Sequence, residues 1–124
     1  MEKVLIIDDD ARNIFAMRAV LSARGFQCTA ADNGRQALTF LQEQPGIGVA
    51  LVDIMMPGMD GFQLIQEIRK DPSLDHVHLV AVTAQAMPGD REKCLAVGAD
   101  DYLSKPVDTA LLFNILHDAS KKRR

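Results

Sequence analysis

Residues 49–61 read Val-Ala-Leu-Val-Asp-Ile-Met-Met-Pro-Gly-Met-Asp-Gly, and this stretch decides the fold of the chain. A short apolar run that ends at turn residues is typical of a fully buried strand. The run leads into Asp53, and an unpaired carboxylate is costly to bury, so we expect this side chain where the strand emerges from the core. Ligand sites of open parallel sheets lie just outside the carboxyl ends of the strands. Asp53 is therefore predicted to be the reactive centre.

Apolar runs and helix-like segments alternate along the rest of the chain. Strands are expected over residues 4–7, 26–31, 47–53, 79–83 and 101–103. Helices are expected over 11–24, 34–44, 61–70, 88–97 and from 109 onward. This alternation with short connections predicts an α/β fold, in which right-handed crossovers place helices on both faces of a doubly wound, five-stranded parallel sheet.

Several residue types mark where these helices begin. Asn33 followed by Gln36 forms a capping-box pattern, and Asp60 is expected to cap the third helix. Pro88 suits the first turn of the fourth helix, because proline is tolerated there. The last helix is expected to turn one apolar side to the core, made of Leu111, Leu112, Ile115 and Leu116.

Composition describes an ordinary globular domain. The chain has 124 residues, enough for one domain over residues 1–124, and its net charge of −3 gives no general attraction to nucleic acid or an anionic membrane. Two distant cysteines, Cys28 and Cys94, form no metal or redox spacing and are expected to be small buried hydrophobes of a reduced, cytoplasmic protein. The basic residues at 121–124 are expected to be solvated rather than to bind nucleic acid.

Polar residues follow the ends of four of the predicted strands. They are Asp8 with Asp9, then Asp53, Thr83, and Lys105 just past the last strand. Three crowded carboxylates stay ionised only if a cation holds them, and hard oxygen ligands with open positions suit Mg²⁺. Lys105 would be a second cation, paired with Asp53 at rest and then with an incoming phosphoryl group. The Thr83 hydroxyl would be placed to donate to a phosphate oxygen.

Helix capping is the simpler explanation of the acidic run at residues 8–10. Carboxylates suit the positive end of a helix, and one of Asp8, Asp9 and Asp10 is expected to cap the first helix. A cap needs only one acid, however, and does not account for Asp53.

The chain resembles the receiver domains of two-component response regulators, which have the flavodoxin-like fold of the bacterial chemotaxis regulator. The resemblance covers essentially the whole sequence. It rests on Ile7-Asp8-Asp9, residues 52–61, Val82-Thr83-Ala84 and residues 98–106.

The resemblance implies a strand order of 2-1-3-4-5 and specific roles for individual residues. Asp53 would accept phosphate, while Asp8, Asp9, Asp53 and the backbone carbonyl of Met55 would support Mg²⁺. Thr83 and Lys105 would bind the phosphoryl oxygens. Tyr102 would change rotamer together with Thr83, and the Lys105–Pro106 bond would be cis.

The resemblance also implies partners. The phosphoryl donor would be a histidine kinase or a histidine phosphotransfer protein, and a downstream protein would read the phosphorylated state; no direct contact with nucleic acid or membrane is implied. Residues 10–13 and 89–94 look like the corresponding stretches of receivers in hybrid sensor kinases, so an excised relay module is the alternative.

Two further details concern the surroundings of Asp53. Met55 and Gln85 occupy positions that, in this family, tune hydrolysis of the phospho-aspartate, and their side chains predict a long-lived phosphoryl group. Ile14 and Phe15 are adjacent, so one is expected to be exposed where a helical donor docks.

Other classes of protein account for the sequence less well. A nucleotide- or flavin-binding domain would need a first loop rich in Gly, Ser or Thr, whereas this loop is rich in Asp. A metal-dependent phosphohydrolase would need a general acid/base and usually a cap. A receiver without chemistry, acting only as a docking surface, would not need the complete set of reactive residues.

The histidines are not expected to take part in the chemistry. His76 and His78 are expected to lie in a surface loop, and His117 is assigned no function.

Overall fold

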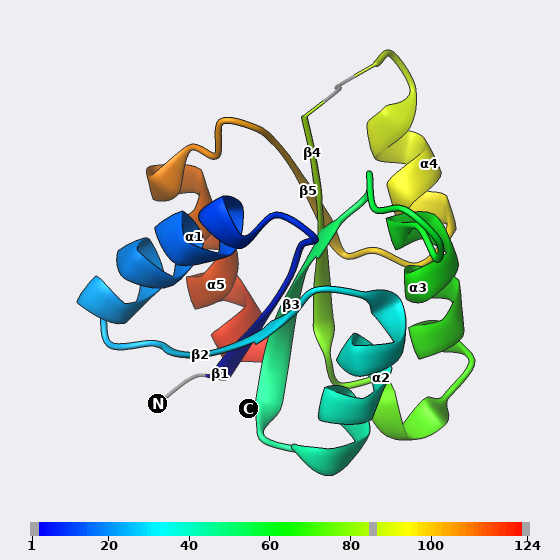
Figure 1. The fold of residues 1–124 in the computed structure, drawn as a ribbon, viewed down its shortest axis with the longest axis horizontal. Coiled ribbons are helices and arrows are strands. Elements are labelled where there is room, and N and C mark those ends of the chain that lie inside the picture. The colour runs from blue at the N-terminus through cyan, green and yellow to red at the C-terminus, as the bar shows by residue number, and fades with distance from the viewer. Residues whose placement is uncertain (1–2, 85–86, 123–124) are drawn as a thin grey trace.

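A computed structural model describes residues 3–84 and 87–122 of the chain. A five-stranded parallel sheet with the order β2-β1-β3-β4-β5 forms its centre (Figure 1). The strands are β1 (Lys3–Ile7), β2 (Gln27–Ala31), β3 (Ile47–Asp53), β4 (His78–Thr83) and β5 (Asp101–Ser104). The helices are α1 (Ala11–Ala23), α2 (Gly34–Glu43), α3 (Gly61–Arg69), α4 (Asp90–Ala96) and α5 (Thr109–Lys122), with a 3-10 turn η1 (Pro72–Leu74) before β4. The predicted α/β architecture and strand order are confirmed.

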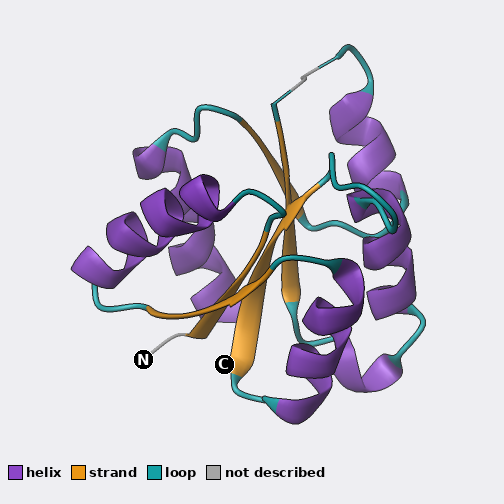
Figure 2. Cartoon of the chain, viewed as in Figure 1, coloured by secondary structure: helices purple, strands orange, loops and turns teal. Residues whose placement is uncertain are grey.

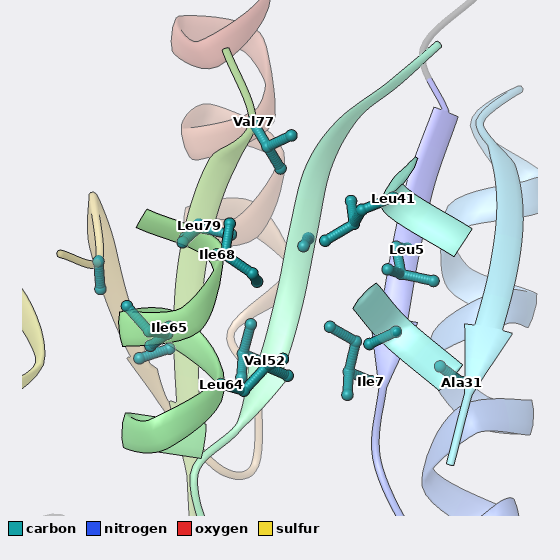
Figure 3. Packing of buried hydrophobic residues seen from close by; sticks show 14 of the residues in the cluster. Leu5, Ile7, Ala31, Leu41, Val52, Leu64, Ile65, Ile68, Val77 and Leu79 are labelled. Carbon is teal, nitrogen blue, oxygen red and sulfur yellow. The ribbon is translucent and has the colours of Figure 1, made fainter. Parts of the chain in front are cut away.

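Helices cover both faces of the sheet. Helices α1 and α5 lie on one face, and α2, α3 and α4 lie on the other (Figure 2). Each face has its own hydrophobic core, and Figure 3 shows side chains of β1, β3 and β4 meeting those of α2 and α3. All seven residues of β3 are buried, because this strand is paired on both edges and covered on both faces. The sequence run that ends in Asp53 is therefore the central strand.

Side-chain caps set the starts of most helices. The Asp10 carboxylate accepts a hydrogen bond from the backbone N–H of Arg12, so one of the three N-terminal acids does cap α1. Asp60 forms a full capping box with Gln63 at α3.

Three predicted details of the helices are wrong. Asn33 caps α2 as predicted and accepts the backbone N–H of Gln36 at 2.8 Å, but the Gln36 side chain accepts from the N–H of Asp32, so the reciprocal half of the capping box is absent. Pro88 precedes α4 instead of lying in its first turn, because Gly89 with φ of +87° is the N-cap residue. Leu111 is 47% exposed, since the buried stripe of α5 runs through Leu112, Ile115, Leu116 and Ala119.

His78 also departs from expectation. It is the first residue of β4 and is buried, with its ring Nε2 2.6 Å from an Asp101 carboxylate oxygen. Of His76 and His78, His76 alone is exposed, in the turn before β4.

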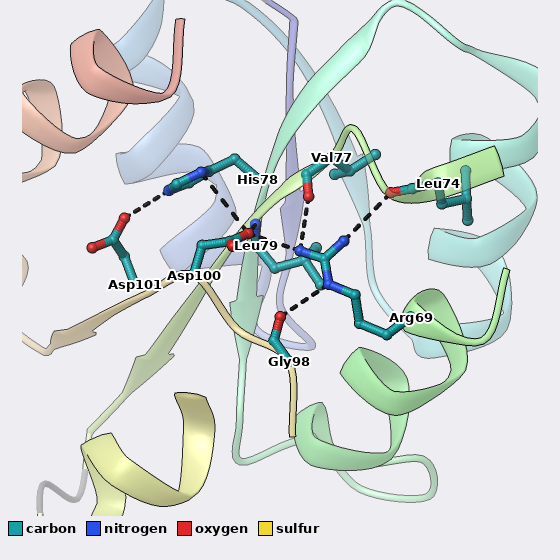
Figure 4. A network of polar contacts seen from close by, with 8 residues as sticks. All are labelled: Arg69, Leu74, Val77, His78, Leu79, Gly98, Asp100 and Asp101. Atoms are coloured by element: carbon teal, nitrogen blue, oxygen red, sulfur yellow. Dashed lines mark hydrogen bonds and ion pairs between the residues drawn. The ribbon is translucent and has the colours of Figure 1, made fainter. Parts of the chain in front are cut away.

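A polar network beside His78 joins α3 to the start of β5 (Figure 4). The Arg69 guanidinium donates to the Gly98 carbonyl at 2.9 Å, the Val77 carbonyl at 3.0 Å and the Asp100 carboxylate at 2.7 Å. Asp100 also accepts the backbone N–H of Leu79 at 2.9 Å. One side chain at the end of α3 thus binds both the turn before β4 and the segment before β5.

Candidate functional site

The carboxyl ends of β1, β3 and β4 bring the predicted site residues to one edge of the sheet. Asp8 follows β1, Asp53 ends β3 and Thr83 ends β4. The parallel register places Ile7 beside Val52 and Asp53 beside Val82, so these strand ends are level. Lys105 follows β5, and its backbone N–H donates to the Thr83 carbonyl at 2.8 Å. The Lys105–Pro106 bond is cis, as the resemblance implied.

Three carboxylates converge at this edge. Ligand oxygens of Asp8, Asp9 and Asp53 all lie within 4.8 Å of one another. Asp8 and Asp53 are buried, whereas Asp9 is exposed, so the cluster is open to solvent on one side. Such a set of hard oxygen donors with open positions fits the coordination preference of Mg²⁺.

Burial dominates the electrostatics of Asp53. Loss of solvent raises the pKa of this carboxyl above its usual value, and the neighbouring Asp8 acts in the same direction. The backbone N–H of Met55, which donates to Asp53 at 3.0 Å, and the charge of Lys105 oppose that rise in pKa. A cation placed among these groups would favour the ionised carboxylate.

Lys105 pairs with a different acid from the one expected. Its ammonium lies 3.1 Å from Asp8 and forms no ion pair with Asp53 in the described part of the chain. The predicted Lys105–Asp53 pair is therefore wrong for this structure. Asp8 has an additional donor in the backbone N–H of Asp10, at 2.9 Å.

Thr83 and Tyr102 face the same small cavity, of about 180 Å³. Met55 and Met87, both largely exposed, lie at its edge. The Tyr102 hydroxyl is buried and has no hydrogen-bond partner within residues 3–84 and 87–122. Burial raises the pKa of this phenol, so it keeps its proton and remains a donor. Gln85, predicted to affect phosphoryl lifetime, lies outside the described residues.

Sequence reasoning missed one residue of the site, Gly61. A Cβ at this position would lie 2.6 Å from the backbone oxygen of Asp53 and 2.6 Å from the Cα of Ile54. Only glycine lets the start of α3 approach the reactive strand this closely. A glycine directly after a capping aspartate was the available signal.

Comparison with known proteins now identifies the family. The model of the response regulator receiver domain matches residues 4–117. The chain belongs to this family. As a receiver it is a signalling module of two-component systems, with the flavodoxin-like fold.

Relatives with this domain have different overall architectures. Protein PilH of Pseudomonas aeruginosa is 34% identical over 118 residues, which is 94% of this chain and 96% of PilH. Hybrid signal transduction histidine kinase I of Dictyostelium discoideum is 37% identical over 94% of this chain, and response regulator PleD of Caulobacter vibrioides is 38% identical over 90% of it. The chain spans only 7% of the length of the hybrid kinase and 24% of the length of PleD.

Solved structures agree with the family assignment. The receiver domain of the Francisella response regulator 1452 superimposes with a TM-score of 0.89 at 27% identity, over 100% of both chains. Within the described residues, no helix is both long and apolar enough to cross a membrane.

Proposed function

We propose that this receiver, over residues 1–124, accepts a phosphoryl group on Asp53 from a phosphohistidine of a partner protein. An Asp53 oxygen attacks phosphorus, the bond between phosphorus and the imidazole nitrogen breaks, and the imidazole leaves as the aspartyl phosphate forms. The observation that carries the proposal is a carboxylate at the end of the central strand, level with Asp8 and close to Lys105. The domain promotes only its own phosphorylation and dephosphorylation and turns over no free substrate.

The acidic cluster is proposed to hold Mg²⁺. Asp8, Asp9 and Asp53 would ligate it together with the backbone carbonyl of Met55, because their convergent oxygens match its chemistry. When bound, the ion supplies positive charge that neutralises the phosphoryl oxygens.

Lys105 and Thr83 complete the phosphoryl site. The Lys105 ammonium exchanges its Asp8 partner for a phosphoryl oxygen once the group is attached, since that oxygen offers a nearby negative charge. The Thr83 hydroxyl, at the end of β4, donates to a second oxygen.

Signalling then needs two states biased by the phosphate. Movement of Thr83 toward the phosphoryl group would vacate space that the Tyr102 ring fills, reshaping the surface formed by α4, β5 and α5. The shared cavity and the unpartnered Tyr102 hydroxyl support this coupling. A Thr83→Ala variant should accept phosphate normally and lose the response of the downstream protein; a wild-type response would contradict the coupling.

The proposed donor is a histidine kinase or a histidine phosphotransfer protein. Phe15 on α1 is 76% exposed, whereas its neighbour Ile14 packs against the core, as the sequence led us to expect. The exposed ring offers an apolar contact for a helical donor. The chain matches 96% of the length of PilH, so one relative consists almost entirely of this domain.

A second candidate is a relay module of a hybrid histidine kinase, passing phosphate on to a histidine phosphotransfer domain. Similarity to the Dictyostelium hybrid kinase and to sensor histidine kinase GacS of Pseudomonas protegens favours it. Either form would be cytoplasmic and would contact neither nucleic acid nor membrane directly.

A long-lived phosphoryl group is expected in both cases. Met55 is 52% exposed beside Asp53, and its thioether cannot position an attacking water as a polar side chain would. A measured half-life of seconds would contradict this expectation.

The deciding experiment measures intact mass after incubation with acetyl phosphate, with and without Mg²⁺. The wild type should gain one phosphoryl group only with Mg²⁺, and chelation should stop the transfer without unfolding the protein. Asp53→Asn should gain none, whereas Asp108→Asn, at the exposed cap of α5, should behave as wild type. Acid-labile phosphate on Asp53→Asn would refute the assignment.

A further inference from the structure

A cavity of about 300 Å³ lies between α1 and the loop that joins β5 to α5. Its floor is formed by Ile6, Leu51 and Val82, which belong to the α1/α5 face of the sheet. Ala16 and Met17 contribute to the wall on α1, and Val107 contributes to the wall opposite. The cavity reaches Asp8, Asp53 and Lys105 at the edge of the sheet.

The strand residues that form the floor are themselves buried. Ile6, Leu51 and Val82 are 3%, 3% and 5% exposed, whereas the residues two positions earlier on the same strands, Val4, Val49 and Val80, are each 0% exposed. The two helices therefore cover this face of the sheet almost completely, and the row next to the acidic cluster keeps only a few per cent of its surface exposed. An apolar group that enters the cavity gains free energy mainly because its own surface is removed from water.

The charges at the open edge are not balanced. The ionisable side chains that line the cavity are two carboxylates, Asp8 and Asp53, and one ammonium, Lys105, so their net charge is −1. Lys105 is already paired with Asp8 at 3.1 Å, and within the described residues no basic side chain forms an ion pair with Asp53. A ligand that complements this site therefore carries a positive charge next to an apolar body.

We propose that this cavity binds a small organic cation, with one aromatic ring on a short alkyl chain that ends in an ammonium or amidinium group. The ring lies on Ile6, Leu51 and Val82, and the cationic group reaches Asp53. The volume suffices, because a dry apolar cavity of about 150 Å³ already accommodates benzene. Such a ligand and a divalent cation compete for the same carboxylate, so it would antagonise phosphorylation. This competition, unlike occupancy of the cavity, rests on the proposed function.

The test is a titration of the methionine-methyl-labelled full chain with phenethylammonium, followed by NMR. Met17 lines the cavity, so its methyl signal should shift with saturation, at a Kd on the order of 1 mM for a ligand of this size. The methyl of Met87, which borders a different cavity, should not shift. The matched anion, 3-phenylpropionate, should bind about tenfold more weakly or worse because it meets a net negative site.

Two variants on α1 separate the cavity from a general surface effect. Ala16→Leu fills the wall and should weaken phenethylammonium binding at least about tenfold. Ala19→Leu adds the same side chain at an exposed position outside the cavity and should bind as wild type. Circular dichroism and thermal unfolding of both variants establish that they are folded.

The outcomes distinguish this inference from the proposed function. No saturable shift of Met17, equal binding of the anion, or wild-type binding by folded Ala16→Leu would overturn the cavity site. If the cation binds as predicted and Mg²⁺ weakens its binding, both the cavity site and the competition for a shared carboxylate are supported. If the cation binds but Mg²⁺ does not displace it, the cavity site stands and the competition is refuted. A separate titration of the wild type with Mg²⁺ alone tests the metal site of the proposed function.

Discussion

Replacing Arg69 by alanine should destabilise the domain strongly, although the residue lies far from the acidic cluster. Its guanidinium joins the end of α3 to the Gly98 and Val77 carbonyls and to the Asp100 carboxylate, and the Arg69 side chain is only 22% exposed. The variant removes the donor to the two carbonyls, leaves Asp100 with the Leu79 backbone N–H but not the guanidinium, and removes the packing of the alkyl stem.

The magnitude follows from these contacts. Each lost hydrogen bond to a carbonyl costs about 0.5–1.5 kcal/mol. The ion pair adds about 0.5–1 kcal/mol, a reduced value because the Asp100 side chain is 40% exposed and screened by solvent. With about 1 kcal/mol for the buried stem, the two lost carbonyl hydrogen bonds and the ion pair together lower the free energy of unfolding by roughly 2.5–5 kcal/mol.

Urea unfolding followed by circular dichroism measures this change. Lys70→Ala provides the control, because Lys70 is the next residue and its pair with Glu67 at 3.3 Å is exposed; its effect should stay within about 0.5 kcal/mol. Arg69→Lys should fall between wild type and alanine, since lysine keeps the charge but not the planar fork. An Arg69→Ala variant as stable as Lys70→Ala would refute the reasoning.

Three further predictions concern the site and the core. Gly61→Ala should lose about 1–3 kcal/mol of unfolding free energy, because its Cβ would clash with the backbone of β3, whereas Gly46→Ala, whose Cβ meets only a lysine carbon at 3.6 Å, should not; urea unfolding compares the two. Lys105→Met should slow phosphorylation by acetyl phosphate about 100-fold, measured by intact mass, and a wild-type rate would exclude Lys105 from the phosphoryl site. Burial raises the pKa of the Cys94 thiol, so at pH 8 this thiol should react with a disulfide reagent only on unfolding. The pKa of Cys28 is also raised by burial, but Cys28 is less buried and should react faster. Equal rates for the two thiols in the folded protein would contradict this order.

The strands and the site edge were predictable because they depend on local patterns. The apolar run before Asp53 predicted β3 with its observed bounds, Ile47–Asp53. Asp60 predicted the start of α3, since a capping side chain bonds to backbone only a few residues away. Parallel strands end at the same edge, so alternation alone predicted that Asp8, Asp53 and Thr83 would converge.

The errors concern contacts between residues far apart in sequence. Lys105 and Asp8 are 97 residues apart, and a choice between two neighbouring carboxylates depends on side-chain geometry that no local pattern contains. His78 was predicted to lie in a surface loop, because nothing in the local sequence indicates that its ring meets Asp101 of a neighbouring strand. Leu111 looked apolar enough for the core, but its helix position lies beside the buried stripe.

The sequence by itself determined the α/β architecture, the central strand and the edge at which the polar residues gather, because periodicity, turns and caps act over a few residues. Tertiary structure alone decided that Lys105 pairs with Asp8, that Gly61 must approach Asp53, and that an apolar cavity stays open beside the acidic cluster. These features depend on how separate elements pack, and packing is set by the shapes of side chains that meet only in the folded chain.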